Sequence, residues 1–217
     1  MSAAERLVAE RGFRGVNASE VVRAAGQKNN SAVAYHFGSW DGLLEAVWTR
    51  HTVGINQRRV ELLTAARSEG PIPLATLVSI YIDPLASELA RSAPSYWARF
   101  NEQWLADAPL NVFDPQSPLP PADRPNPEVE TVSVVADLLN QIIKRLKHLP
   151  VADRSRRVAL MTRFVIGALA AWERDSQGDD RQDLDQLNQE LLNLALALLL
   201  APAAKRGRRQ AGGSAIP

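Results

Sequence analysis

The chain has 217 residues, of which 46% are hydrophobic, and this is ample for a packed core. Its 25 Lys and Arg residues nearly balance 24 Asp and Glu residues, which excludes a global positive field and leaves any nucleic-acid-binding surface to local arrangement. The absence of cysteine excludes disulfides, thiolate zinc sites and thiol nucleophiles.

Targeting and membrane-spanning segments are not expected from the sequence. The start, MSAAERLVAERGF, lacks the apolar stretch of a signal peptide. The most apolar run, over 191–201, is interrupted by Asn193 and falls well short of the roughly 20 residues that cross a bilayer. We therefore expect a cytoplasmic protein with no membrane partner.

Helical periodicity and stop signals divide almost the whole chain into helices, and no alternating stretch of strand length stands out. We therefore predict an all-α fold. Asn17 and Glu20 have the N-cap and N3 spacing of a capping box, and Ser39 can cap a longer helix. Gly12 and Gly26 are placed as helix terminators. The first four helices are predicted over 3–12, 18–25, 30–37 and 39–66.

The rest of the chain contains five more predicted helices and a long loop. Seven of the 14 prolines fall between Pro109 and Pro127, so this segment cannot be regular structure. Beyond Pro202 the chain is too polar and glycine-rich to pack. The five helices are predicted over 73–91, 93–108, 127–148, 152–177 and 181–200.

The stretch over 17–44 contains two short helices separated by a turn that begins at Gly26. This is the helix-turn-helix arrangement, in which the second helix enters the major groove of DNA and the first braces it. Further features are Gly12-Phe13, the run E-V-V-R-A-A-G that ends at Gly26, Tyr35-His36-Phe37, and Ser39 ahead of Leu43-Leu44. With these features, residues 3–51 resemble the DNA-binding domain of the TetR family.

The sequence departs from the family's pattern at three points. Ten residues separate Gly26 from Phe37, where the family usually has nine. The usual tyrosine three residues before Phe37 is Ala34, and Tyr35 lies one position later, about 100° round the helix. Trp40 replaces a lysine that is usual in the family. The resemblance therefore implies a phosphate contact for Tyr35 at a shifted position, and none for Trp40.

Amide, hydroxyl and ammonium groups concentrate where the recognition helix begins. Asn and Gln side chains can bridge N6 and N7 of adenine, and a lysine can reach guanine acceptors or phosphate. Alternatively, one asparagine caps the helix while its neighbours form a solvated turn, and Tyr35 and His36 pack between helices. The predicted DNA-binding residues are Gln27, Lys28, Asn29, Asn30, Ser31, Ala32, Tyr35 and His36.

The charges of the first fifty residues nearly cancel. Phosphate affinity per protomer is therefore expected to be modest, which makes two half-sites more necessary. The cations are Arg6, Arg11, Arg14, Arg23, Lys28 and Arg50, and the anions are Glu5, Glu10, Glu20, Asp41 and Glu45.

The helix predicted over 181–200 becomes apolar nearly all round from Leu191. A helix without a polar face must be covered on every side, and a second subunit can supply that cover; an intrachain core is the alternative. TetR-like proteins place a two-helix contribution to a four-helix dimer interface at this position. The residues predicted at a homodimer interface are Val165, Leu169, Trp172, Leu187, Leu191, Leu194 and Leu198. A second apolar stripe on the helix over 152–177 consists of Leu160, Phe164, Ala168 and Ala171.

Aromatic residues concentrate in the middle helices. Trp97, Phe100 and Trp104 are spaced i, i+3 and i+7, so they share a helix face that can line a ligand cavity, or can be ordinary core. Pro84 lies inside a helical pattern, where it is expected to bend the helix or to separate two short helices. The predicted ligand-binding residues are Tyr81, Asp83, Trp97, Phe100 and Trp104.

We therefore predict a DNA-binding transcriptional regulator with no catalytic residues, cofactor or metal. His51 and His148 have no neighbouring ligands at metal spacing, and we expect ordinary surface or core histidines. The resemblance implies a repressor that binds a palindromic double-stranded DNA operator as a homodimer and is released by an unknown small-molecule effector. The predicted units are 1–50 for DNA binding, 51–201 for ligand binding and dimerisation, and a disordered basic tail over 202–217.

The sequence leaves two other function classes open. An all-α enzyme has little support, because no phosphate-binding glycine loop and no H-E-x-x-H or G-x-S-x-G motif is present. A helical ligand-binding protein without DNA binding is supported by Ala34, Trp40 and the nearly neutral first fifty residues.

Overall fold

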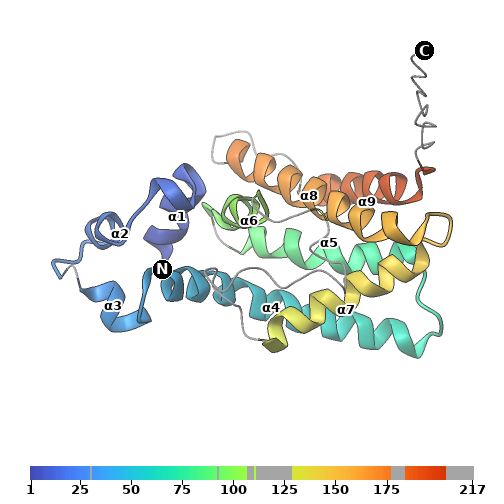
Figure 1. Ribbon diagram of the computed structural model, residues 1–217, viewed down its shortest axis with the longest axis horizontal. Coiled ribbons are helices and arrows are strands. Elements are labelled where there is room, and N and C mark those ends of the chain that lie inside the picture. Colours follow the sequence, from blue (N-terminus) through green and yellow to red (C-terminus); the bar gives the residue numbers. More distant parts are fainter. Residues whose placement is uncertain (30, 92, 107–109, 111–128, 177–183, 204–217) are drawn as a thin grey trace, which may run out of the picture.

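The computed structural model describes residues 1–29, 31–91, 93–106, 110, 129–176 and 184–203 (Figure 1). Every regular element in these ranges is helical, which confirms the predicted all-α fold. The predicted loop over 109–127 lies outside the described residues apart from Leu110, and so does the predicted tail from residue 204 onward. The elements are α1 Ser2–Arg11, the 3-10 turn η1 Phe13–Gly15, α2 Ala18–Ala24, α3 Ala32–Phe37, α4 Trp40–Ser68, α5 Leu74–Ala90, α6 Trp97–Ala106, α7 Val129–Arg145, α8 Val151–Asp175 and α9 Leu184–Leu200.

α4 joins the two ends of an elongated molecule (Figure 1). α1, α2 and α3 gather at one end, around the first turns of α4. Further along, α4 packs against α5 and α7, and α5 lies between α4 and the pair α8 and α9. α4 is one continuous helix of 29 residues, so the boundary predicted between residues 50 and 51 falls inside it. The division into two functional units stays a prediction.

Side-chain caps fix where the N-terminal helices begin. Asn17 Oδ1 accepts from the backbone N–H of Glu20, and Glu20 Oε2 accepts from that of Asn17, both at 3.1 Å, which confirms the predicted capping box. Ser39 Oγ accepts from the N–H of Gly42 at 2.9 Å at the start of α4. Position 42 requires glycine, because a Cβ there would lie 2.1 Å from the carbonyl oxygen of Phe37. The end of α3 and the start of α4 are therefore in close contact.

The recognition helix α3 begins at Ala32, not at the predicted residue 30. Asn29 Oδ1 accepts from the backbone N–H of Ser31 at 2.9 Å, and the Asn29 carbonyl oxygen accepts from that of Ala32 at 3.0 Å. Asparagine favours such local turns over helix because its side chain competes for backbone groups. The turn before α3 is longer as a result.

A carboxylate on α8 sets the start of α6, at residue 97 instead of the predicted 93. Glu173 is almost fully buried. Its Oε1 accepts from the Ser95 hydroxyl at 2.6 Å and from the Ala98 N–H at 3.0 Å. Its Oε2 accepts from the backbone N–H of Arg99 at 3.0 Å and from Arg99 Nε at 3.3 Å. The negative charge satisfies free N–H groups at the positive end of the helix dipole.

α5 runs unbroken from Leu74 to Ala90 although Pro84 lies inside it. The alternative of two short helices separated at Pro84 is therefore wrong. Proline has no N–H to donate to the Ile80 carbonyl oxygen, but Ile82 and Leu85 on either side of it are buried in the core. Packing of a buried face stabilises a helix more than local propensity does, and here it overrides the proline.

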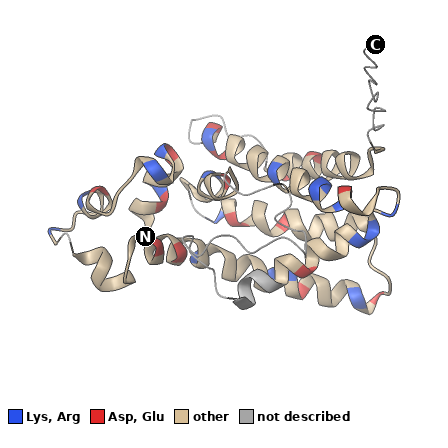
Figure 2. Ribbon diagram, in the orientation of Figure 1, with Lys and Arg blue, Asp and Glu red and all other residues tan. Residues whose placement is uncertain are grey.

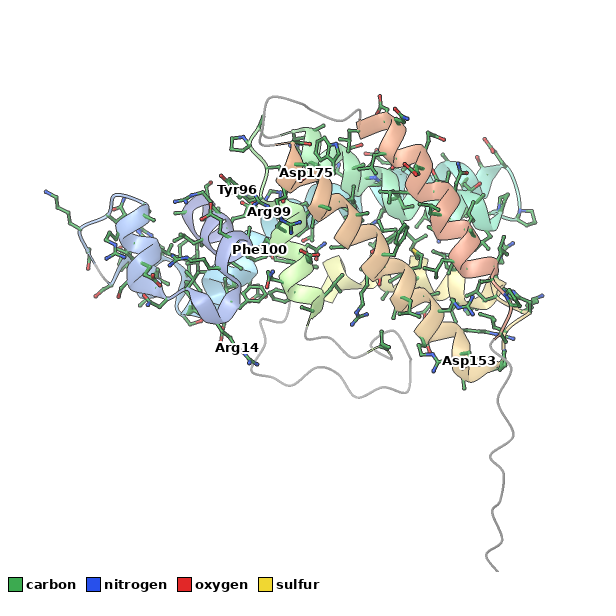
Figure 3. All side chains as sticks on the ribbon, turned by 90° about the horizontal axis from the view of Figure 1, so that it is seen from above. Arg14, Tyr96, Arg99, Phe100, Asp153 and Asp175 are labelled. Atoms are coloured by element: carbon green, nitrogen blue, oxygen red, sulfur yellow. The ribbon has the colours of Figure 1, made fainter. Side chains whose placement is uncertain are left out.

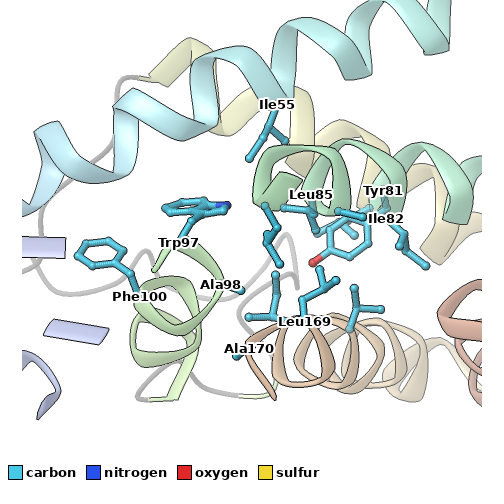
Figure 4. Packing of buried hydrophobic residues seen from close by; sticks show 14 of the residues in the cluster. Ile55, Tyr81, Ile82, Leu85, Trp97, Ala98, Phe100, Leu169 and Ala170 are labelled. Atoms are coloured by element: carbon cyan, nitrogen blue, oxygen red, sulfur yellow. The ribbon is translucent and has the colours of Figure 1, made fainter. Parts of the chain in front are cut away.

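One continuous apolar core runs from the N-terminal helices through the C-terminal ones. Arg157 on α8 closes the last turn of α9, since its Nη1 donates to the carbonyl oxygens of Leu198 and Ala201, both at 2.8 Å. None of the described helices is long and apolar enough to cross a membrane. Figure 4 shows side chains from α4, α5, α6 and α8 meeting in the central core, among them Ile55, Tyr81, Leu85, Trp97 and Leu169.

We expect Glu173→Ala to lower the free energy of unfolding by about 3–5 kcal/mol, because it leaves Arg99 and the start of α6 without their buried acceptor. Glu102→Ala is the matched control. Its ion pair with Arg174 also joins α6 to α8, but it is exposed and 3.6 Å long, so we expect a loss of about 1 kcal/mol or less. Urea unfolding measures both, and equal losses would contradict the special role of Glu173.

Candidate nucleic-acid interface and its link to the core

α2 and α3 form the predicted helix-turn-helix pair, at the end of the molecule far from α9 (Figure 1). Val21 and Val22 on α2 and Val33 on α3 are buried. α2 contacts α1 and α3, and α3 contacts α4, so that α1 to α3 and the first turns of α4 form an N-terminal unit. The turn between the two helices points away from the rest of the molecule. The core thus holds the pair in place while it leaves the turn open to a partner.

The turn between α2 and α3 presents the predicted DNA-binding side chains to solvent. Asn29 Oδ1 is engaged by the Ser31 N–H, so Asn29 has its side-chain amide N–H groups left for a base or a phosphate. Ala32, the first residue of α3, is half-buried, and Asn30 lies outside the described residues. The exposed members of the set in this turn are Gln27, Lys28, Asn29 and Ser31.

Tyr35 is the most exposed large side chain of α3, with 82% of its surface accessible. Its ring meets the ring of His36 edge-on at a centroid distance of 4.9 Å, and His36 is exposed as well. Neither ring is buried between helices, so both polar tips are available as phosphate donors. Trp40, which replaces the family's lysine, instead packs half-buried against the core.

Basic and acidic residues lie close together along the N-terminal helices (Figure 2). Ion pairs occupy three of the six cations in the first fifty residues. The other three, Arg14, Arg23 and Lys28, are exposed, and none of them is paired with a carboxylate in the part of the chain that the structure describes. Arg14 projects from the edge of the N-terminal unit (Figure 3). Since only half of these cations are paired, positive charge is left to bind phosphate, although the net charge of the first fifty residues is close to zero. The pairs are Arg6 with Glu10 at 3.3 Å, Arg11 with Glu20 at 2.9 Å, and Arg50 with Glu5.

Residues 1–47, which comprise α1 to α3 and the first turns of α4, match the family model described as bacterial regulatory proteins, tetR family. The N-terminal helices are therefore a DNA-binding domain of the tetR family. The resemblance predicted from the sequence is thereby confirmed, and with it DNA binding in transcription regulation. No curated protein matches the chain.

A row of aromatic rings on α6 supports the DNA-binding helices. Phe13 in η1 makes edge contacts with Phe100 at 5.5 Å and Trp104 at 5.6 Å. Trp48 on α4 stacks on Trp104, and Trp97 stacks on Phe100, both at 6.1 Å. Phe100 lies where α6 meets the N-terminal helices (Figure 3). Three of the predicted ligand-binding residues thus lie at the contact between the two ends of the molecule, and their ligand role stays a prediction.

The other two predicted ligand-binding residues lie on α5. Tyr81 is buried, and it lies apart from Trp97 in the core (Figure 4). Asp83 is half-buried, and its carboxylate accepts from the Ser79 hydroxyl and, at 2.9 Å, from Asn188 Nδ2. Asp83 therefore ties α5 to α9. The structure does not bring the five predicted residues together in one cluster.

His51 on α4 joins the DNA-binding helices to the core through two carboxylates. Its Nε2 lies 3.1 Å from Glu5 Oε1 on α1, and its Nδ1 lies 2.7 Å from Glu88 Oε1 on α5. Its ring stacks on Trp97 at 4.7 Å. Both ring nitrogens can donate only when the imidazole is protonated. A protonated His51 therefore bridges the two carboxylates beside the ion pair of Arg50 with Glu5, and Arg50 Nη2 lies 3.2 Å from its Nε2.

Burial acts to lower the pKa of His51, but the hydrogen bonds to Glu5 and Glu88 outweigh it, and the pKa is raised above its ordinary value. Arg91 extends the cluster by pairing with Glu88 at 3.1 Å. Sequence reasoning missed this link because 37 residues separate His51 from Glu88, and no local spacing indicates the contact. No group of His, Asp and Glu in the described ranges is arranged to hold a metal ion.

The residues predicted at the dimer interface divide between core and surface. Val165, Leu169 and Leu191 are buried within their own chain, and a role for them at a dimer interface stays a prediction. Leu194 is 46% exposed. The second apolar stripe of α8 forms its outer face instead, with Leu160 41% exposed. The half-buried residues of both groups are Trp172, Leu187, Leu198, Phe164 and Ala168, and Ala171 is exposed.

We expect the wild-type protein to lose stability relative to His51→Gln as the pH rises above about 6.5 and through the raised folded-state pKa of His51. The folded-state pKa of His51 is raised, so its contribution is fully present below the unfolded-state pKa of about 6.5 and is lost as the pH rises through the folded-state pKa. Urea unfolding at several pH values measures this. His148→Gln, at an exposed site, should follow the wild type. Parallel wild-type and His51→Gln curves would rule out the imidazolium link.

Proposed function

We propose that this regulator is a repressor that binds a palindromic operator as a homodimer and is released by a small-molecule effector. The observation that carries the proposal is the turn between α2 and α3, whose amide, hydroxyl and ammonium side chains are exposed to solvent. Such groups read base edges, while free cations and hydroxyls hold phosphate. Regulators of this family are generally not enzymes, and we assign no reaction to the chain.

An exposed apolar face on α8 and α9 supports the homodimer. Leu160 on α8 and Leu194 on α9 are both more than two-fifths exposed, and the two helices pack against each other. Large apolar side chains grouped on neighbouring helices are typical of an interaction surface. A two-fold dimer pairs such a face with its own copy and supplies two recognition helices for two half-sites. The first fifty residues have three cations without a carboxylate partner in the described structure, and this small number favours a dimer, because one half-site alone would be bound weakly.

Release by an effector has a physical route through α6. Glu173 on α8 holds the start of α6, and the aromatic row of α6 supports Phe13 beside the DNA-binding helices. A ligand that shifts α8 together with α6 would therefore move α1, α2 and α3 as well. Operator affinity falls if the effector favours a dimer whose recognition helices no longer match the half-site spacing.

We expect Gln27→Ala and Lys28→Ala to separate base reading from phosphate binding. Gln27→Ala should weaken binding to the cognate operator by about 1–3 kcal/mol and change binding to random DNA little. Lys28→Ala should weaken binding to both and lower the slope of affinity against salt by about one counterion. Fluorescence anisotropy with duplexes from upstream of the protein's own gene measures both effects.

Arg67→Ala is the control for loss of charge, because Arg67 is exposed near the far end of α4. Its operator affinity should equal that of the wild type. If all three variants bind every duplex as the wild type does, the turn between α2 and α3 is not the DNA-binding surface.

We expect Leu194→Glu to raise the dissociation constant of the dimer by about 100-fold or more, because an unpaired charge would be buried between subunits. Sedimentation at several concentrations measures the change. Val60→Glu is the matched control, since Val60 on α4 is exposed to the same degree, 47% against 46%. A dimer that survives Leu194→Glu unchanged, or that Val60→Glu dissociates equally, would place the interface elsewhere.

A further inference from the structure

Arg59 on α4 carries a positive charge into the core. Only 4% of its surface is exposed, and Ile55 and Leu63, four residues away on either side, are buried on the same helix face. Burial lowers the pKa of Arg59 to about 10. The side chain is therefore still charged at neutral pH.

The guanidinium group of Arg59 uses only part of its hydrogen-bonding capacity. Nη1 donates to Asn56 Oδ1 at 2.9 Å, and Nη2 donates to the backbone carbonyl oxygen of Tyr81 at 3.1 Å. The group also lies 5.2 Å from the centre of the Tyr81 ring. Nε is buried without an acceptor. Since a guanidinium has five N–H donors, donors are left over for a further partner.

No carboxylate in the described ranges is paired with Arg59. Asp83 on the adjacent helix is engaged by Ser79 and Asn188 instead. A buried charge without a counter-ion is strongly destabilising, and deeply buried arginines are almost always paired. The other buried arginine follows this rule, because Arg99 pairs with Glu173. Arg59 is the exception.

Tyr81 adds a second donor to the same cluster. Its side chain is buried, and Figure 4 shows its hydroxyl directed toward α8. Burial raises the pKa of Tyr81 to about 12, so the hydroxyl keeps its proton at neutral pH. The donors left on Arg59 and the protonated hydroxyl of Tyr81 therefore belong to neighbouring side chains in the core.

We propose that Arg59 binds the carboxylate of the effector, and that the effector is a small organic acid with an apolar body. The inference rests on the proposed release by an effector and names the chemical class of that molecule. A single guanidinium matches a single carboxylate through two parallel hydrogen bonds. The apolar residues on the same face of α4 suit a hydrocarbon or aromatic body. Arg59 lies about two turns along α4 from His51, so the acid would bind to the helix that leads to the DNA-binding end.

The experiment compares acids with their uncharged amides on the full-length protein. The probes are octanoate with octanamide and 4-phenylbutanoate with 4-phenylbutanamide. Titration calorimetry at pH 7.5 should show at least one acid binding the wild type about 10- to 100-fold more tightly than its amide, because only the acid forms charged hydrogen bonds with Arg59. The same acid should raise Tm, since it binds only the folded state.

Arg59→Gln should abolish the preference for the acid, and Arg67→Gln, an exposed site on the same helix, should keep it. Tyr81→Phe should weaken binding of the acid by a smaller factor than Arg59→Gln does. If Arg59→Gln does not fold, the wild-type comparison of acid with amide decides alone. Equal binding of acid and amide, binding of neither, or a preference that survives Arg59→Gln would each overturn the proposal.

Operator titrations in the same samples separate this inference from the proposed function. If the acid binds through Arg59 but operator affinity does not change, the carboxylate site stands and release by an effector fails. If an amide and its acid release the operator equally, the proposed release by an effector stands, and the proposed role of Arg59 fails. Release by an effector and carboxylate binding by Arg59 both hold only if the acid lowers operator affinity, by about 5- to 150-fold, and Arg59→Gln removes that response.

Discussion

The carboxylate of Glu173 accepts four hydrogen bonds at the start of α6, and the relation between the two ends of the molecule follows from it. A carboxylate buried this deeply is tolerated only when its oxygens are satisfied. α6 therefore cannot slide or rotate on α8 without leaving a charge unpaired. Because Phe13 rests on the aromatic row of α6, the position of the DNA-binding helices is set from α8, the helix that also leaves Leu160 exposed.

Short-range chemistry explains why so much of the fold could be predicted from the sequence. Asn17 and Glu20 satisfy each other within a single helical turn, so their spacing alone predicts the start of α2. The same holds for Ser39 and α4. The exposed turn before α3 was predictable too, because polar residues follow a glycine there. The start of α6 was not, because its acceptor, Glu173, lies 74 residues from Arg99 in the chain.

The sequence does not show which partners pack against the apolar faces of α6 and α8, and the structure does. α8 has two apolar stripes, and composition does not tell which one faces its own core; the structure buries Val165 and leaves Leu160 outside. The aromatic stripe of α6 likewise had two interpretations, and its contacts with Phe13 became visible only in three dimensions. Arg59 was missed because a single arginine in a helix usually lies in solvent. Only its burial and unused donors indicate a partner.

The unbroken length of α4 has a mechanical consequence. With 29 residues the helix is about 40 Å long, and its first turns are fixed to α3 through the close approach of Gly42 to Phe37. A rotation of about 5° at one end of a rod of that length displaces the other end by roughly 3.5 Å, which is about the rise of one base pair. A change in packing too small to disturb the core can therefore shift the recognition helix out of register with its half-site.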